Sequence, residues 1–293
     1  MALPKKAQGV LLRFFGVFSL IRGYNIAVLV FALYLTAHYI LAPNLGLVEL
    51  LLDLNLLFLV LASAATTASG YIINNFFDAA KDQINRPHKY LLEHLVSQQQ
   101  QLVLYFILSL MALFFAGLVS IRAVLFFGAY IVAIALYSSV IKRLYWLSNI
   151  FAALLVILPF FALTLYFRNF ETLIFFHAGF LYALILVRDG IKDLQNLKGD
   201  WVQRYRTIPV VFGSRVSKFW ISVAIVVASS MAFLLWQQPL GLMRNYFLFA
   251  LLYLLVVIVL LWSANSQKAY LWLHNSLKLL ILIGVCSIYW MNK

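Results

Sequence analysis

The sequence predicts an all-α integral membrane protein with about nine transmembrane helices in one bundle, and two features of the chain support this. Hydrophobic residues make up 65% of the 293 residues and charged residues only 11%, against about 45–50% and about 25% in soluble domains. The mean hydropathy is +0.96. A soluble protein of this composition would need a very large core with almost no polar surface, so we expect the chain to fold in a bilayer.

The second feature is a series of nine apolar segments, each close to the roughly 20 residues that a spanning helix needs. Two connecting segments, residues 74–100 and 189–216, are too polar for the bilayer and too long for tight turns, and long ordered loops are usually functional. We expect one domain over residues 1–293. The predicted spans are residues 17–40, 47–73, 101–119, 121–139, 145–166, 172–188, 217–236, 245–263 and 269–290.

The orientation follows from Lys and Arg, which concentrate in cytoplasmic loops. With the N-terminus inside, sixteen of these residues fall in inside loops and four outside. We therefore expect a cytoplasmic N-terminus in the cell's inner or plasma membrane, with both polar segments on the cytoplasmic side. This bias also explains the net charge of +13, so we expect no nucleic acid partner. Lys5 and Lys6 precede an apolar run without a small-residue cleavage site, which indicates a first membrane helix.

Acidic residues are rare, and they cluster. Five of the nine Asp and Glu residues fall in two short windows, one in each polar segment. We name residues 74–82 the first motif and residues 188–200 the second motif. The polar side chains of each recur at helical spacing and so share one helix face. They are Asn74, Asp78 and Asp82 in the first motif, and Asp189, Asp193, Asn196 and Asp200 in the second.

Like charges four residues apart destabilise a helix by about 0.2–0.5 kcal/mol, and carboxylates near the bilayer indicate a functional site. We therefore expect a cation there. Oxygen ligands favour Mg²⁺, or else Mn²⁺, over zinc, and Mg²⁺ typically takes one or two carboxylates and completes its shell with water and substrate phosphates. Two such motifs predict a diphosphate bridged by metal ions. The candidate metal ligands are Asn74, Asp78, Asp82, Asp193, Asn196 and Asp200.

These motifs resemble those of the UbiA superfamily of intramembrane prenyltransferases. The first motif is similar to the family's Asn-Asp-x-x-Asp-x-x-x-Asp pattern, and the second to its second Asp-rich pattern. Lys192-Asp193 with Gly199-Asp200 looks most like the digeranylgeranylglyceryl phosphate synthase branch. Further similar segments, in order, are Ile21-Arg22 with Asn25, Ile84-Asn85-Arg86-Pro87, Leu136-Tyr137-Ser138 with Lys142-Arg143, and Thr207-Ile208-Pro209 with Phe212-Gly213.

The resemblance implies an enzyme that transfers an isoprenoid chain from a prenyl diphosphate to a lipid-like or aromatic acceptor among membrane lipids. A glycerol-phosphate lipid is the favoured acceptor and an aromatic quinone precursor the next. The implied diphosphate ligands are Asn74, Arg86, Lys142 and Arg22, and the implied catalytic residues are Asp78, Asp82, Asp189, Asp193 and Lys142.

Two departures from the family pattern keep alternatives open. Asn75 stands where the family usually has Asp, and Asn196 where a carboxylate is common. The segment after Pro87 also lacks the family's usual Pro and Gly residues. A catalytically impaired family member is therefore one alternative. An ion or solute transporter is the other, although transporters usually place carboxylates near the bilayer midplane rather than at helix ends.

Overall fold

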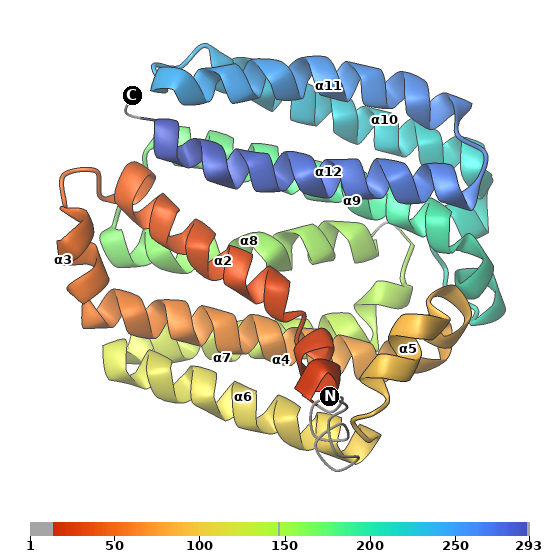
Figure 1. The fold of residues 1–293 in the computed structure, drawn as a ribbon, viewed down its shortest axis with the longest axis horizontal. Helices are drawn as coiled ribbons and strands as arrows, with labels where there is room; N and C mark the ends of the chain where they lie inside the picture. Colours follow the sequence, from red (N-terminus) through yellow and green to blue (C-terminus); the bar gives the residue numbers. More distant parts are fainter. Residues whose placement is uncertain (1–13, 146, 292–293) are drawn as a thin grey trace, which may run out of the picture. The chain divides into compact units, whose positions relative to one another are not determined.

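A computed structural model describes residues 14–145 and 147–291. Within these residues nine helices are long and apolar enough to cross a membrane, and the one isolated β-bridge joins Leu144 to Arg206. The predicted all-α fold with nine spans is confirmed. Residues 14–20 are helical. The elements that follow (Figure 1) are α2 (Gly23–Thr36), η1 (Ala37–Leu41), α3 (Leu47–Leu52), α4 (Leu54–Asn85), α5 (Pro87–Glu93), α6 (Gln98–Val119), α7 (Ile121–Ser139), η2 (Ile141–Arg143), α8 (Leu147–Phe167), α9 (Thr172–Val202), α10 (Ile208–Trp236), η3 (Gly241–Met243), α11 (Arg244–Ser263), α12 (Gln267–Ser287) and η4 (Ile288–Trp290).

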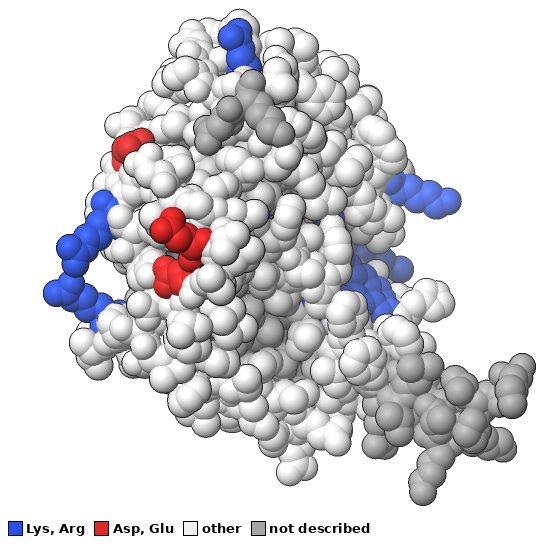
Figure 2. All heavy atoms as spheres, turned by 60° about the vertical axis from the view of Figure 1, so that its left-hand side comes forward, with Lys and Arg blue, Asp and Glu red and all other residues white. Residues whose placement is uncertain are grey.

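The surface carries the apolar side chains that a bilayer requires. Leu110 and Phe114 on α6 and Val259 on α11 are each more than 60% exposed, although they are large and hydrophobic. Figure 2 shows a face on which charged side chains are few and scattered among uncharged ones. In water such a surface would promote aggregation, whereas in lipid it is the expected solvent contact.

The predicted second span, residues 47–73, is wrong at both ends. Asp53 interrupts it, because the Asp53 Oδ1 atom accepts hydrogen bonds from the backbone N–H groups of Asn55 and Leu56, at 3.0 and 3.2 Å, and so caps the start of α4. The same helix then continues to Asn85. It ends there because Pro87 disfavours a helical conformation at Arg86, which has φ −145° and ψ 61°.

The predicted sixth and seventh spans are too short. The sixth, predicted at 172–188, continues as α9 to Val202, and the seventh, predicted at 217–236, begins as α10 at Ile208. The two polar segments are therefore largely helical. Hydropathy reports the cost of a residue in lipid rather than its ability to form a helix. At 32 residues, α4 is about 48 Å long, which exceeds the roughly 30 Å hydrocarbon core and lets its polar end extend beyond it.

The helices form two compact units. The first comprises residues 1–31 and 53–140, and the second residues 32–52 and 141–293. In the first unit α4 packs against α5, α6 and α7; in the second, α9 packs against α8, α10 and α12. Each motif thus lies on a helix that packs against three other α-helices of its own unit. The expectation of one domain over the chain stays a prediction.

Candidate active site

The first motif occupies the C-terminal end of α4. Asn74, Asp78 and Asp82 are each half-buried and share one helix face, as their spacing predicts. Arg86 follows directly, half-buried, and its backbone N–H donates to the carbonyl oxygen of Asp82 at 2.8 Å. The structure therefore brings two predicted carboxylates and two predicted diphosphate ligands together on one stretch of chain.

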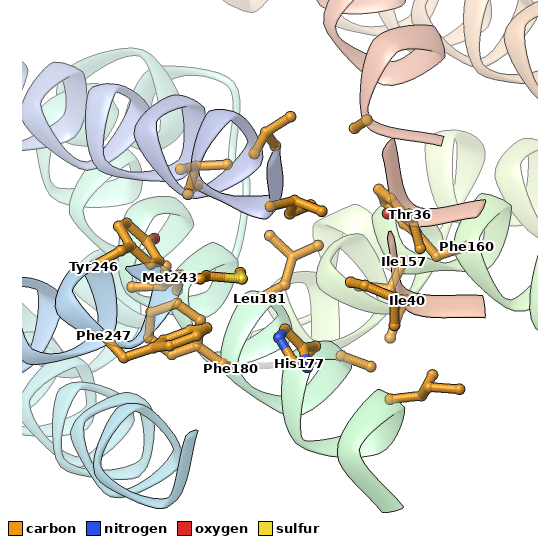
Figure 3. Close-up of a pocket in the computed structure, with 18 of the residues that line it drawn as sticks. Thr36, Ile40, Ile157, Phe160, His177, Phe180, Leu181, Met243, Tyr246 and Phe247 are labelled. Carbon is orange, nitrogen blue, oxygen red and sulfur yellow. The ribbon is translucent and has the colours of Figure 1, made fainter. Parts of the chain in front are cut away.

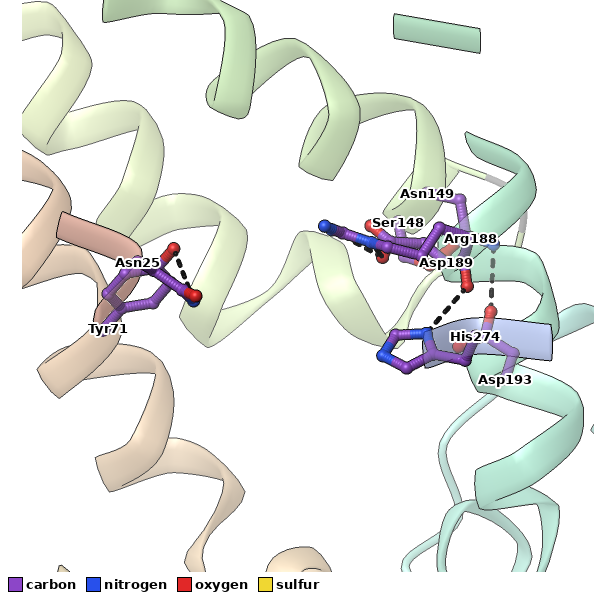
Figure 4. A network of polar contacts seen from close by, with 8 residues as sticks. All are labelled: Asn25, Tyr71, Ser148, Asn149, Arg188, Asp189, Asp193 and His274. Atoms are coloured by element: carbon purple, nitrogen blue, oxygen red, sulfur yellow. Dashed lines mark hydrogen bonds and ion pairs between the residues drawn. The ribbon is translucent and has the colours of Figure 1, made fainter. Parts of the chain in front are cut away.

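Arg22 and Asn25, from the start of α2, reach the same helix at Tyr71. The Arg22 guanidinium lies over the Tyr71 ring, 4.6 Å from its centroid, and Asn25 Nδ2 donates to the Tyr71 hydroxyl at 3.4 Å (Figure 4). Arg22 has φ 51°, a left-handed conformation that is uncommon outside glycine and clusters at functional sites. Tyr71 precedes Asp78 by seven residues, two helical turns on the same face, so these contacts place the predicted Arg22 beside the first motif.

Glu93, in α5, is a buried acid that the sequence analysis did not assign to the site. It is 1% exposed and accepts a hydrogen bond from Asn75 Nδ2. Its other carboxylate oxygen contacts Lys89 Nζ at 3.1 Å and the Ser19 hydroxyl at 3.3 Å. Burial, followed by the positive charge of Arg22, lowers the pKa of Lys89, and the carboxylates of Glu93 and Asp82 offset this only in part. We call Ser19, Asn75, Lys89 and Glu93 the Glu93 cluster.

The second motif begins in the C-terminal half of α9, where two carboxylates have different partners (Figure 4). Asp189 pairs with the adjacent Arg188 at 3.0 Å. Asp193 Oδ2 accepts a hydrogen bond from Asn149 Nδ2 of α8 at 2.9 Å. His274 of α12 approaches the Arg188 carbonyl oxygen at 3.4 Å and can bond it only as a donor. Side chains from α8 and α12 thus orient the motif.

The remainder of the second motif lies deeper. Asn196 is 4% exposed and Asp200 is fully buried, and the Thr207 hydroxyl donates to Asp200 Oδ2 at 3.5 Å. Asp200 therefore contacts the residue that precedes α10. Lys142, the predicted catalytic cation of the same unit, lies in η2 and is also buried, with 6% exposed.

Sequence reasoning missed several partners of the predicted residues. Glu93 had a detectable signal, since it is one of only nine acids and follows the first motif closely. Asn149, Tyr71 and His274 had none, because an isolated Asn, Tyr or His in an apolar segment is ordinary. Their proximity to the motifs depends on how α2, α8 and α12 pack, which no local pattern encodes.

The donor chemistry of both motifs fits a hard divalent cation. In the described part of the chain no group of three or more His, Cys, Asp and Glu side chains could by itself enclose a metal ion. Zinc prefers such closed sites. Mg²⁺ needs only one or two carboxylates and leaves positions for substrate phosphates. Asp78 and Asp82, or Asp189 and Asp193, can provide these carboxylates.

The family model of the UbiA prenyltransferase family matches residues 26–282, which includes both motifs and all but the ends of the chain. This protein belongs to the UbiA prenyltransferase family. It is a membrane prenyltransferase, and the predicted resemblance to this family is thereby confirmed.

Curated relatives of this prenyltransferase are similar over most of the chain. The digeranylgeranylglyceryl phosphate synthase of Thermococcus sibiricus is 29% identical over 229 residues, which cover 74% of this chain and 78% of the relative. The enzyme of the same name from Methanosphaera stadtmanae is 22% identical over 197 residues, 66% of this chain and 68% of the relative.

Solved structures share the fold of this prenyltransferase. A UbiA homologue from Archaeoglobus fulgidus bound to GPP and Mg²⁺ superposes with a TM-score of 0.66 at 15% identity, covering 94% of this chain and 99% of the homologue. A structure of digeranylgeranylglyceryl phosphate synthase gives a TM-score of 0.67 at 16% identity, covering 93% and 96%. These likenesses establish the fold.

The second unit of the prenyltransferase also contains an apolar cavity of about 110 Å³ (Figure 3). Leu181, Met243 and Phe247 are among its lining residues. His177 is its notable polar residue: its Nδ1 atom lies 2.8 Å from the Leu173 carbonyl, and its Nε2 atom is buried without a hydrogen-bond partner. A cavity of this character suits hydrocarbon.

Proposed function

We propose that this prenyltransferase transfers a geranylgeranyl chain to glyceryl phosphate that already carries one such chain, with Mg²⁺ as the metal. The observation that carries the proposal is that both Asp-containing motifs end the two longest described helices, α4 and α9, outside the apolar stretch. The relatives' names, digeranylgeranylglyceryl phosphate synthase, support the acceptor, and the homologue bound to GPP and Mg²⁺ supports the donor class and the metal.

In this proposal the carboxylates of Asp78, Asp82, Asp189 and Asp193 would hold the metal ions, and Asn74, Asn196 and Asp200 would be further oxygen ligands. Bound Mg²⁺ would neutralise charge that develops on the diphosphate. Arg22, Arg86 and Lys142 bind the diphosphate oxygens directly, since fixed cations stabilise a leaving anion. The C1–O bond of the donor breaks, the acceptor hydroxyl oxygen bonds to C1, and the hydroxyl proton is lost to water.

The isoprenoid chain lies, in our proposal, along α9 towards the cavity at Leu181. Asp189 and His177 are separated by twelve residues on this helix, which is about 18 Å. An apolar chain of several isoprene units is long enough to span this distance within one unit. The charge bias of the loops supports the part of our proposal that puts both motifs on the cytoplasmic side of the plasma membrane.

The test is transfer from radiolabelled geranylgeranyl diphosphate by purified protein in nanodiscs, with and without Mg²⁺. Geranylgeranylglyceryl phosphate and an aromatic quinone precursor are compared as acceptors. We expect an ether-lipid product that disappears with EDTA and returns with Mg²⁺. Product with the aromatic acceptor alone would overturn the proposed acceptor. No metal-dependent binding of donor and no transfer to either acceptor would overturn the proposal and favour an impaired family member or a transporter.

A further inference from the structure

Glu93 connects three separate segments of the first unit. Its carboxylate receives Ser19 from the helix at residues 14–20, Asn75 from α4 and Lys89 from its own helix, α5. A carboxylate that is 1% exposed is costly to bury unless its charge is paired and hydrogen-bonded. These three donors meet that requirement, so the cluster is a built feature rather than an incidental surface contact.

Asn75 makes this arrangement possible. An amide nitrogen donates a hydrogen bond, whereas an ionised Asp accepts only. Asp at position 75 would bring two buried carboxylates into contact, and one of them would have to take up a proton. Asn75, which departs from the family motif, and Glu93 therefore belong together: the amide of this pair is on α4 and its carboxylate is on α5.

Lys89 is the cation that this arrangement holds in place. One of its three N–H donors is directed to Glu93 Oε1 at 3.1 Å, which leaves two for other acceptors. The positive charge of Arg22 and the carboxylate of Asp82 both act on Lys89, so its ammonium lies within electrostatic reach of the first motif. Its side chain is 27% exposed, and a ligand can therefore reach it.

We propose that Glu93 is a positioning residue for prenyl transfer, which uses the amide of Asn75 to fix α5 and hold Lys89 beside the first motif as a further ligand of the diphosphate. This inference rests on the proposed function, and it assigns Asn75 a constructive role in an active enzyme. It predicts that the cluster requires one carboxylate and one amide, and tolerates their exchange.

The test is a reciprocal exchange of near-isosteric side chains: Glu93→Gln, Asn75→Asp and the double variant. We expect each single change to raise the KM for geranylgeranyl diphosphate by about 10-fold or more, the usual effect of removing a residue that orients a ligand. The double variant should recover to within about threefold of wild type, because the amide introduced in α5 can donate to the carboxylate introduced in α4. Glu171→Gln, an exposed acid before α9, is the matched control with unchanged KM.

The Lys89→Met variant tests whether Lys89 is the group that Glu93 positions. It should raise the KM as Glu93→Gln does, and combining the two should add little, since residues that act as one unit are not additive. If the KM of the double variant is no lower than the KM of Asn75→Asp, the inference is overturned. A Glu93→Gln protein that melts at lower temperature but keeps its KM also overturns it, since the role is then structural. Mg²⁺-dependent donor binding, measured calorimetrically, gives the same comparison without turnover and so separates failure of this inference from failure of the proposed acceptor.

Discussion

The first and second motifs end two helices of similar length, yet their surroundings differ. Near the first, two cations come from other segments of the chain: Arg22 lies over Tyr71 and Lys89 pairs with Glu93. Around the second, Asp189 pairs with the adjacent Arg188, and Asp193 accepts from the neutral amide of Asn149. An amide donor orients a carboxylate without adding a charge of its own.

This contrast indicates that the two motifs have different roles. In our proposal the first motif contributes carboxylates that lie near Arg22 and Lys89, and the second contributes Asp193, which a neighbouring helix orients through Asn149. Repetition of an Asp spacing along the sequence therefore does not imply repetition of function. The predictions below test the contrast, from the largest expected effect to the smallest.

The largest effect is expected from the carboxylates themselves. Asp78→Asn and Asp193→Asn should each reduce kcat/KM by about 100-fold or more, because each removes charge that balances the metal ions near the reacting bond. Steady-state transfer at saturating Mg²⁺ measures this. Asp53→Asn is the matched control, since Asn also caps helices well and position 53 lies at the other end of α4. Full activity in either motif variant would remove that motif from the reaction.

A smaller effect is expected from Asn149. Asn149→Ala should leave Asp193 in place but poorly oriented, and raise the Mg²⁺ concentration for half-maximal activity by about 10–100-fold, as loss of outer-sphere partners usually does. Asn149→Asp should be worse still, since it places a like charge at 2.9 Å from Asp193 Oδ2. The Mg²⁺ titration distinguishes the two. An unchanged midpoint in both variants would show that Asp193 does not bind the metal.

The pH dependence of donor binding is expected to show the loss of the proton from the Lys89 ammonium. Burial lowers the pKa of Lys89, so its ammonium loses a proton at lower pH than an ordinary lysine. Affinity for the donor should therefore weaken as pH rises through this lowered pKa. Lys89→Arg stays charged at high pH, and its KM should remain flat over the same range. Identical alkaline profiles for both proteins would rule out Lys89 as a diphosphate ligand.

The smallest effect concerns chain length. Leu181→Trp should fill part of the cavity and lower the preference for geranylgeranyl over farnesyl diphosphate by about 10-fold, a typical contrast for crowded apolar pockets. The ratio of the two kcat/KM values is the measurement. Leu255→Trp, at a half-exposed position on α11, controls for a new Trp in a membrane helix. An unchanged ratio in Leu181→Trp would show that the isoprenoid chain does not occupy this cavity.

The sequence predicted the class of fold and the shared helical faces of the two motifs, because each depends on local pattern. Apolar length gave nine spans, and carboxylate spacing gave the helical faces of Asp78 and Asp82 and of Asp189 and Asp193. It mispredicted where α4 and α9 end, because polar residues that cannot enter lipid still form helices. It also did not reveal the partners Glu93 and Asn149, since those contacts depend on the packing of separate helices.

The central claim is that each motif is required for metal-dependent binding of the prenyl diphosphate. The most direct test is Mg²⁺-dependent binding of a non-reactive thiolodiphosphate analogue of the donor to wild type, Asp78→Asn and Asp193→Asn. The account predicts that wild type binds the analogue only with Mg²⁺, and that either substitution alone abolishes this metal-dependent binding. Unchanged metal-dependent binding in one of the two variants would contradict it, because a single motif would then suffice to hold the diphosphate.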